Sequence, residues 1–167
     1  MYDELTEVDI QKMQEEIDHR ILVLRPQYIE EVQQARAFGD LSENFEYKEA
    51  KRQKNRNDSR IRYLEKMIKT AKVIKSDHKA GCVGLFDHVT LWLPEDEEEM
   101  EIQLVTTLRT NADGGYISRQ SPLGKAIFGR HEGDTVTVQV SADISYPVTI
   151  RSIRPGEDDA SLPISSY

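Results

Sequence analysis

Two long apolar stripes that flank a short acidic segment constrain the fold more than any other feature of the chain. The segment, residues 37–47, reads AFGDLSENFEY. On each side of it, mostly apolar residues recur at steps of three and four, a spacing typical of coiled-coil helices. The stripes comprise Ile10, Met13, Ile17, Ile21, Leu24, Tyr28, Val32 and Ala35 before the segment, and Tyr47, Ala50, Lys54, Asn57, Ile61, Leu64, Ile68 and Ala71 after it. The chain is therefore expected to fold back at the acidic segment into an antiparallel helical hairpin.

The stripes also predict how the two arms pair. A turn near residues 41–43 would place Tyr28 opposite Asn57, where a polar side chain fixes the register of the seam at some cost in stability. Each arm of about thirty residues would be roughly 45 Å long at a rise of about 1.5 Å per residue. Pro26 cannot donate a backbone hydrogen bond, so it is expected to bend the first arm or split it into two segments.

Composition favours a soluble protein with one ordinary domain or two small ones. The 167 residues are 38% hydrophobic and 31% charged, and no apolar run approaches the length that spans a bilayer. The acidic N-terminus lacks the basic and apolar regions of a secretory signal. Cys82 is the single cysteine, which excludes an internal disulfide and a cysteine-rich zinc site. We therefore expect a cytoplasmic protein with no membrane partner.

The net charge of −8 is distributed in three blocks. Residues 1–47 carry 4 basic and 12 acidic side chains, residues 48–79 carry 12 and 4, and residues 80–167 carry 6 and 14. The second arm is thus a basic stripe. It either neutralises the acidic first arm or holds nucleic-acid phosphates near the turn. The acidic overall charge argues against a freestanding DNA-binding protein.

Beyond the second arm the apolar period changes to two, which is typical of half-buried antiparallel strands. The alternating residues are Val83, Leu85, Val89, Leu91, Leu93, Ile102, Leu104, Val136, Val138, Val140, Val148 and Ile150. Residues 94–99 and 111–115 have the composition of exposed hairpin turns. Ser121 is suited to cap a short helix that has Pro122 at its first position.

We therefore predict an α+β protein. Residues 1–78 form the coiled-coil hairpin with its tip near residues 39–45, and residues 79–155 form a small antiparallel β-sheet domain with one short helix. Residues 156–167 are polar and are expected to form a flexible tail.

Asp40 and Glu43 lie three residues apart in the acidic segment. One interpretation is structural: Gly39 ends the first arm, and Asp40 caps the second with Glu43 at its third position. The other interpretation is chemical: both carboxylates project from the end of the hairpin and bind a divalent cation such as Mg²⁺. Because two carboxylates are too few for a dedicated magnesium site, a partner would supply the remaining ligands.

The segment GDLSENFEY resembles the tip signature of the bacterial Gre transcript cleavage factors. A second segment, SPLGKAIFG followed by EGDTVTV, is similar to the same family, and the likeness extends over residues 5–154. The resemblance implies an FKBP-like C-terminal domain that docks at the rim of the RNA polymerase secondary channel, and a hairpin that enters the channel. It also implies a protein that is not an enzyme on its own and instead stimulates the polymerase to cleave the 3′ end of backtracked RNA.

The resemblance also implies roles for individual residues. Asp40 and Glu43 correspond to the catalytic tip acids, which help to hold Mg²⁺ shared with the polymerase active site; the free monomer would carry no cofactor. The other carried-over positions are Ser42, Asn44, Phe45 and Tyr47 as tip support, Lys48, Lys51, Arg52 and Lys54 for RNA, and Ser121, Pro122, Leu123 and Gly124 for docking on the polymerase.

Alternatives stay open at this point. Relatives with the same fold bind the channel and inhibit the polymerase without stimulating cleavage. Phe45 stands where the family usually has alanine, and its ring would either stack on RNA or obstruct the channel. A dimeric coiled-coil scaffold, formed by stripes from two chains, is a further alternative. His78, Cys82 and His88 lack the paired spacing of zinc ligands and are interpreted as linker and strand residues.

Overall fold

The structure of the 167-residue chain is a computed structural model that describes residues 3–39, 44–75 and 79–165. The chain divides into two compact units: Ile10–Ala71 form one, and Asp3–Asp9 together with Lys72–Tyr167 form the other. Within the described residues, no helix combines the length and the apolar character that crossing a bilayer requires.

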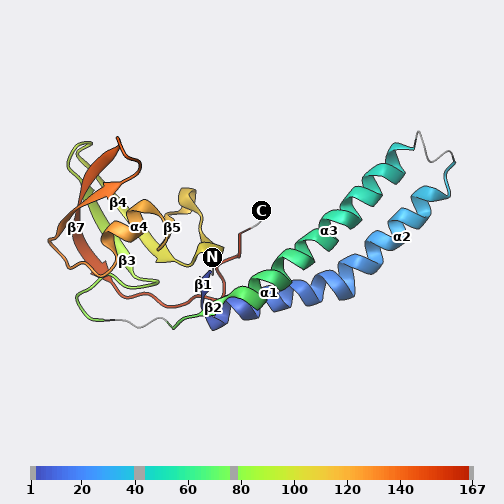
Figure 1. The fold of residues 1–167 in the computed structure, drawn as a ribbon, viewed down its shortest axis with the longest axis horizontal. Helices are drawn as coiled ribbons and strands as arrows, with labels where there is room; N and C mark the ends of the chain where they lie inside the picture. The colour runs from blue at the N-terminus through green and yellow to red at the C-terminus, as the bar shows by residue number, and fades with distance from the viewer. Residues whose placement is uncertain (1–2, 40–43, 76–78, 166–167) are drawn as a thin grey trace. The chain divides into compact units, whose positions relative to one another are not determined.

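The first unit is the predicted helical hairpin (Figure 1). Its first arm runs through α1 (Glu7–His19), a π-helical turn η1 (Arg20–Leu24) and α2 (Arg25–Arg36), and its second arm is α3 (Phe45–Thr70). The π turn ends where the Arg25 N–H donates to the Arg20 carbonyl oxygen, directly before Pro26 at the start of α2. A π turn is one way for a helix to adjust to a proline that donates no hydrogen bond. Pro26 thus changes the local helix type as expected of a proline, but the first arm stays helical from Glu7 to Arg36 and is not split into separate segments.

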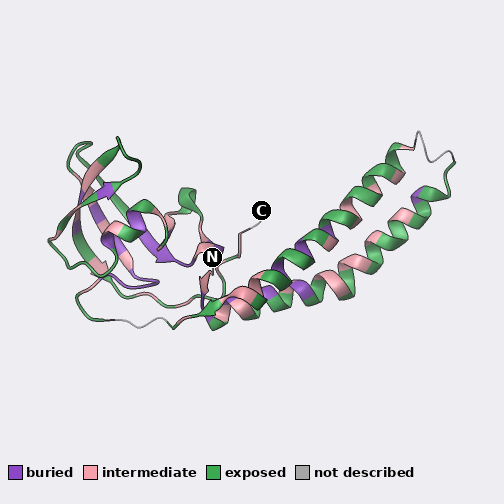
Figure 2. Ribbon diagram, in the orientation of Figure 1, coloured by how far each residue is buried: buried purple, intermediate pink, exposed green. Residues whose placement is uncertain are grey.

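The seam of the hairpin follows the predicted stripes (Figure 2). Its buried residues are Met13, Ile17 and Ala35 from the first arm and Asn57, Arg60, Ile61 and Leu64 from α3. The predicted pairing of Tyr28 with Asn57 is wrong. The Asn57 side chain instead contacts Arg20, eight positions earlier in the first arm, and bonds to its backbone carbonyl oxygen at 3.2 Å.

The second unit contains a five-stranded sheet with the order β5-β4-β3-β7-β6. Its strands are β3 (His88–Leu93), β4 (Glu98–Val105), β5 (Tyr116–Ser118), β6 (Thr135–Gln139) and β7 (Ser145–Arg154). The turn predicted at residues 94–99 joins β3 to the antiparallel β4. One helix, α4 (Pro122–Ile127), packs Leu123 and Ile127 into the core formed by the sheet.

The sheet is mixed, so the prediction of a purely antiparallel sheet needs one correction. β5 runs parallel to β4, with Gln103 opposite Tyr116 and Val105 opposite Ser118. The predicted turn at residues 111–115 is present, because Asn111 and Tyr116 form an antiparallel bridge across it. It lies within a longer connection from β4 to β5 that holds two 3-10 turns, η2 (Thr107–Arg109) and η3 (Ala112–Gly114). Because this connection reverses the chain twice, β5 takes the direction of β4.

The start of the chain belongs to the second unit, although residues 1–78 were assigned to the hairpin. β1 (Glu4–Leu5) pairs in parallel with β2 (Lys72–Val73), which directly follows the end of α3. The helical pattern was expected to persist to about residue 74 and ends at Thr70. Leu5 is fully buried, which shows why this two-residue strand is retained.

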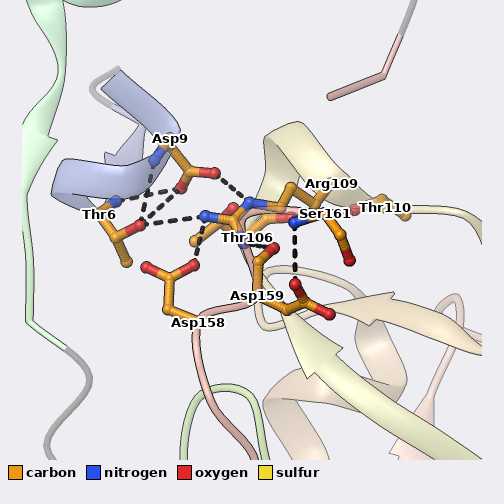
Figure 3. Close-up of polar contacts among 8 residues, drawn as sticks. All are labelled: Thr6, Asp9, Thr106, Arg109, Thr110, Asp158, Asp159 and Ser161. Atoms are coloured by element: carbon orange, nitrogen blue, oxygen red, sulfur yellow. Dashed lines mark hydrogen bonds and ion pairs between the residues drawn. The ribbon is translucent and has the colours of Figure 1, made fainter. Parts of the chain in front are cut away.

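A buried polar cluster holds the C-terminal segment, where a flexible tail was expected (Figure 3). Arg109 donates through Nε to the Asp9 carboxylate at 2.6 Å and through Nη1 to the Asp159 carbonyl oxygen at 3.1 Å, and it forms an ion pair with Asp158. Asp9 and Thr6 form a reciprocal cap at the start of α1, in which each accepts from the backbone N–H of the other. Polar tail residues are ordered here because they neutralise a buried guanidinium group.

Candidate functional site

The candidate site is the end of the hairpin, between the last residue of α2 and the first residue of α3. Asp40, Ser42 and Glu43 lie outside the described residues. The residues that flank them, Gly39 and Asn44, are described. Gly39 has a φ of +123°, a backbone conformation that favours glycine, as expected where the first arm ends.

Asn44 joins the two arms directly below the tip. Its Oδ1 accepts from the Tyr47 backbone N–H at 3.1 Å, and its Nδ2 donates to the Ala35 carbonyl oxygen at 2.7 Å. Asn44 is thus the N-cap of α3 and also binds a carbonyl group in the last turn of α2. The structural interpretation of the acidic segment, in which Asp40 caps the second arm, is therefore wrong.

Two aromatic residues follow the cap and differ in exposure. Tyr47 is half-buried, and its ring lies 5.8 Å from the Arg36 guanidinium group of α2. Phe45 is 83% exposed, and the Lys48 ammonium group lies 5.8 Å from the centre of its ring. The tip therefore presents one anchored ring and one that is open to a partner.

The four basic residues assigned to RNA contact do not share one environment. Lys48, Lys51 and Arg52 are exposed. Lys54 is half-buried and pairs at 3.4 Å with Asp58, which also binds Arg25 of the first arm. Lys54 thus neutralises a carboxylate at the seam, while the first three residues leave positive charge at the surface near the tip.

A charged network stabilises the seam farther from the tip. The Glu16 carboxylate accepts from Arg20 Nε and from Arg60 Nε, each at 2.8 Å, and Arg20 also donates to Asn57 at 3.0 Å. Burial alone would raise the pKa of Glu16. The hydrogen bonds and positive charges of Arg60 and Arg20 outweigh burial, so the pKa lies below its ordinary value.

The residues assigned to polymerase docking are largely used to build the second unit. Ser121 caps α4 by accepting from the Gly124 backbone N–H at 3.1 Å, as predicted. Leu123 and Gly124 are buried, and a Cβ atom on Gly124 would collide with the Ser118 carbonyl oxygen. Of the four residues only Pro122 is exposed. The segment therefore has a packing role, and its role in docking stays a prediction.

The described residues contain no group of three or more His, Cys, Asp or Glu side chains placed to hold a metal ion. Cys82 contacts a residue that sequence analysis missed: its Sγ lies 3.2 Å from His131 Nε2. The two residues lie 49 positions apart and pair in an isolated β-bridge, so no local sequence motif indicates the contact. His88 begins β3 as a half-buried strand residue, and His78 lies outside the described residues.

Two family models match the chain. Residues 4–73 match the N-terminal domain of the GreA/GreB transcription elongation factors, and residues 78–155 match their C-terminal domain. The two matches together cover both units, and they fall in the order that the family has.

Individual relatives agree with the family models. The chain is 40% identical over 141 residues to transcription elongation factor GreA of Thermoanaerobacter pseudethanolicus, covering 84% of this chain and 90% of that protein. It is 37% identical over 144 residues to GreA of Mesomycoplasma hyopneumoniae, covering 86% and 90%. A solved structure of the transcription factor Gfh1 overlaps 92% of this chain and 97% of its own at 21% identity, with a TM-score of 0.45, too low to bear on function.

Proposed function

Because the chain belongs to the GreA/GreB family of transcription elongation factors, we propose that it stimulates RNA polymerase to cleave the 3′ end of backtracked RNA. In this proposal the hairpin enters the secondary channel of the polymerase, and the polymerase supplies the active site. The chain contributes Asp40 and Glu43 at the end of the hairpin and is not an enzyme on its own.

The observation that carries the proposal is the cap of α3. Asn44 occupies the N-cap position and satisfies the Tyr47 N–H, so the start of the helix does not require the carboxylates of Asp40 or Glu43. Both acids precede the helix in the segment that joins the arms. A helix start that is capped by Asn44 supports a role for the two acids outside the helix.

The donor set fits magnesium. Carboxylate oxygens are preferred ligands of Mg²⁺, which usually takes only one or two of them and completes its shell with water and phosphate oxygens. When bound in a pair, such ions stabilise the attacking and leaving oxygens of a phosphoryl displacement. Asp40 and Glu43 would hold the ion that the polymerase shares, and either carboxylate would orient the attacking water or accept its proton.

The surrounding residues support this role. Asn44 ties the last turn of α2 to the start of α3, on either side of the acidic segment in the sequence. The exposed Lys48, Lys51 and Arg52 provide positive charge near the tip for the phosphates of the extruded RNA. We assign no RNA contact to Lys54, because it already pairs with Asp58.

A stalled, backtracked polymerase complex tests the proposal. Adding the protein is expected to shorten the RNA. At a Mg²⁺ concentration that suffices for the native protein, Asp40→Asn or Glu43→Gln should strongly slow the shortening while binding to the polymerase persists. Glu65→Gln, which removes an exposed charge from α3 far from the tip, is the matched control. Slowed RNA extension that is indifferent to the two tip variants would instead identify a channel inhibitor.

A further inference from the structure

A groove runs between the two arms just below the tip of the hairpin. Its floor includes Ala35 of α2 and Ala50 of α3, and its volume is about 500 Å³. The small side chains at these two positions leave the space open. The groove is formed entirely within the hairpin unit, by residues that the structure describes.

Two phenylalanine rings border this groove. Phe38 is 77% exposed and Phe45 is 83% exposed, so each ring has apolar surface that a bound partner would cover. Exposed aromatic residues next to an apolar groove are typical of binding surfaces. Phe38 lies beyond the end of α2 and Phe45 is the first residue of α3, so neither ring is needed for the seam.

The charged residues along the groove are all acidic. Glu31, Glu46 and Glu49 line it, and none of the described residues that line it is a lysine or an arginine. Arg52 approaches Glu49 at 3.8 Å from the side of the helix, and the other two carboxylates have no cation within ion-pair distance among the described residues. The helical repeat places Lys48 and Lys51 on the flank of α3 opposite to Glu46.

We propose that this groove binds a segment of the RNA polymerase that presents a lysine or arginine side chain, an inference that rests on the proposed function. The carboxylates attract the cation, and the alanine floor accommodates its aliphatic stem. The Phe38 ring offers a cation–π contact to the partner, whereas the Phe45 ring already lies 5.8 Å from the Lys48 ammonium group and offers apolar surface. RNA suits the groove less well, because three carboxylates repel its phosphates. In this proposal the basic flank of α3 faces RNA, and the groove on the other flank binds the polymerase segment.

Photo-crosslinking of the full chain tests which molecule occupies the groove. Phe38 is replaced by p-benzoyl-phenylalanine, and the protein is added to core polymerase without nucleic acid and to a backtracked complex. A crosslink to a polymerase peptide that contains a basic residue is expected in both samples. A crosslink to RNA alone, or to a second copy of the chain, would overturn the proposal.

Affinity for core polymerase provides the second measurement. Phe38→Ala and Glu46→Lys are each expected to weaken binding about tenfold. Glu65→Lys, the same charge reversal on α3 away from the groove, should change binding less than about twofold. Circular dichroism confirms that each variant keeps its helix. Equal affinity of both groove variants and the control would contradict the proposal.

Failure of this inference is distinguishable from failure of the proposed function. RNA shortening by Phe38→Ala should return to the native rate when enough protein is added to saturate the polymerase. Shortening by Asp40→Asn should stay slow at the same Mg²⁺ concentration, however much protein is added. Loss of shortening by Phe38→Ala at saturation would contradict a role in binding alone.

Discussion

Arg20 and Asn57 bind each other in both directions across the seam of the hairpin. Arg20 Nη1 donates to Asn57 Oδ1 at 3.0 Å, and Asn57 Nδ2 donates to the Arg20 backbone carbonyl oxygen at 3.2 Å. Arg20 is the first residue of the π turn. Its carbonyl group is thus bonded by an asparagine side chain, and the pair fixes the two arms at this point.

We expect Asn57→Ala to destabilise the hairpin by about 1–3 kcal/mol, because it removes both hydrogen bonds that join Asn57 to Arg20 across the seam. Urea unfolding followed by helical circular dichroism measures the change. Asn55→Ala, an exposed asparagine on the same helix, should cost less than about 0.5 kcal/mol. Equal losses in the two variants would show that Asn57 has no special role in the register.

The Glu16 network makes hairpin stability depend on pH. The pKa of Glu16 is lowered in the folded protein, so its contribution is present above the unfolded-state pKa of about 4.3 and is lost as pH falls through the lower folded value. We expect Glu16→Gln to be less stable than the native protein at pH 7, with a difference that shrinks below about pH 4.3. Denaturant unfolding between pH 7 and pH 3 measures it.

Glu15→Gln is the matched control for this prediction, because Glu15 is exposed and accepts only from Gln11 on the same helix among the described contacts. Its stability should follow that of the native protein at every pH. A difference between Glu16→Gln and the native protein that stays constant down to pH 3 would contradict the assignment.

Arg109 anchors the C-terminal segment to the start of α1. We expect Arg109→Met to cost about 3–5 kcal/mol, since it leaves the fully buried Asp9 carboxylate without its cation. Thermal unfolding measures the loss. Arg154→Met removes an exposed arginine that pairs with Glu101 at 3.3 Å, and it should cost less than about 1 kcal/mol. A similar loss from both variants would mean that the buried cluster stabilises the protein no more than an exposed ion pair does.

Gly124 is required by close packing. A methyl group at this position would overlap the Ser118 carbonyl oxygen, so the backbone of α4 must shift. We expect Gly124→Ala to destabilise the second unit by about 2 kcal/mol or more, and Lys125→Ala, an exposed change on the same helix, by less than about 0.5 kcal/mol. Unchanged melting of Gly124→Ala would contradict this packing role.

The sequence was sufficient to predict both arms, because burying an apolar stripe requires a repeat that is visible in the residues themselves. Ser121 and Pro122 likewise act locally, and the cap of α4 was predicted correctly. The register was not predictable in the same way. It depends on a π turn before Pro26 and on a backbone carbonyl group that accepts from Asn57, and neither leaves a side-chain pattern.

Other errors came from competition between similar groups or from distant partners. Asp40 and Asn44 are both good helix caps by residue type, and the bond from Asn44 to the Ala35 carbonyl group is a contact that the sequence does not indicate. The C-terminal segment looked flexible because its residues are polar. Its partner Arg109 lies about fifty positions away, so the charge pairing that holds Asp158 and Asp159 could not be recognised locally.

In the proposed function, Asp40 and Glu43 supply magnesium ligands to the polymerase. The most direct test measures the rate of RNA shortening in a backtracked complex against Mg²⁺ concentration, at saturating protein. We expect Asp40→Asn and Glu43→Gln each to raise the Mg²⁺ concentration needed for half the maximal rate, and Glu65→Gln to leave it unchanged. An identical Mg²⁺ dependence for the native protein and both tip variants would contradict it.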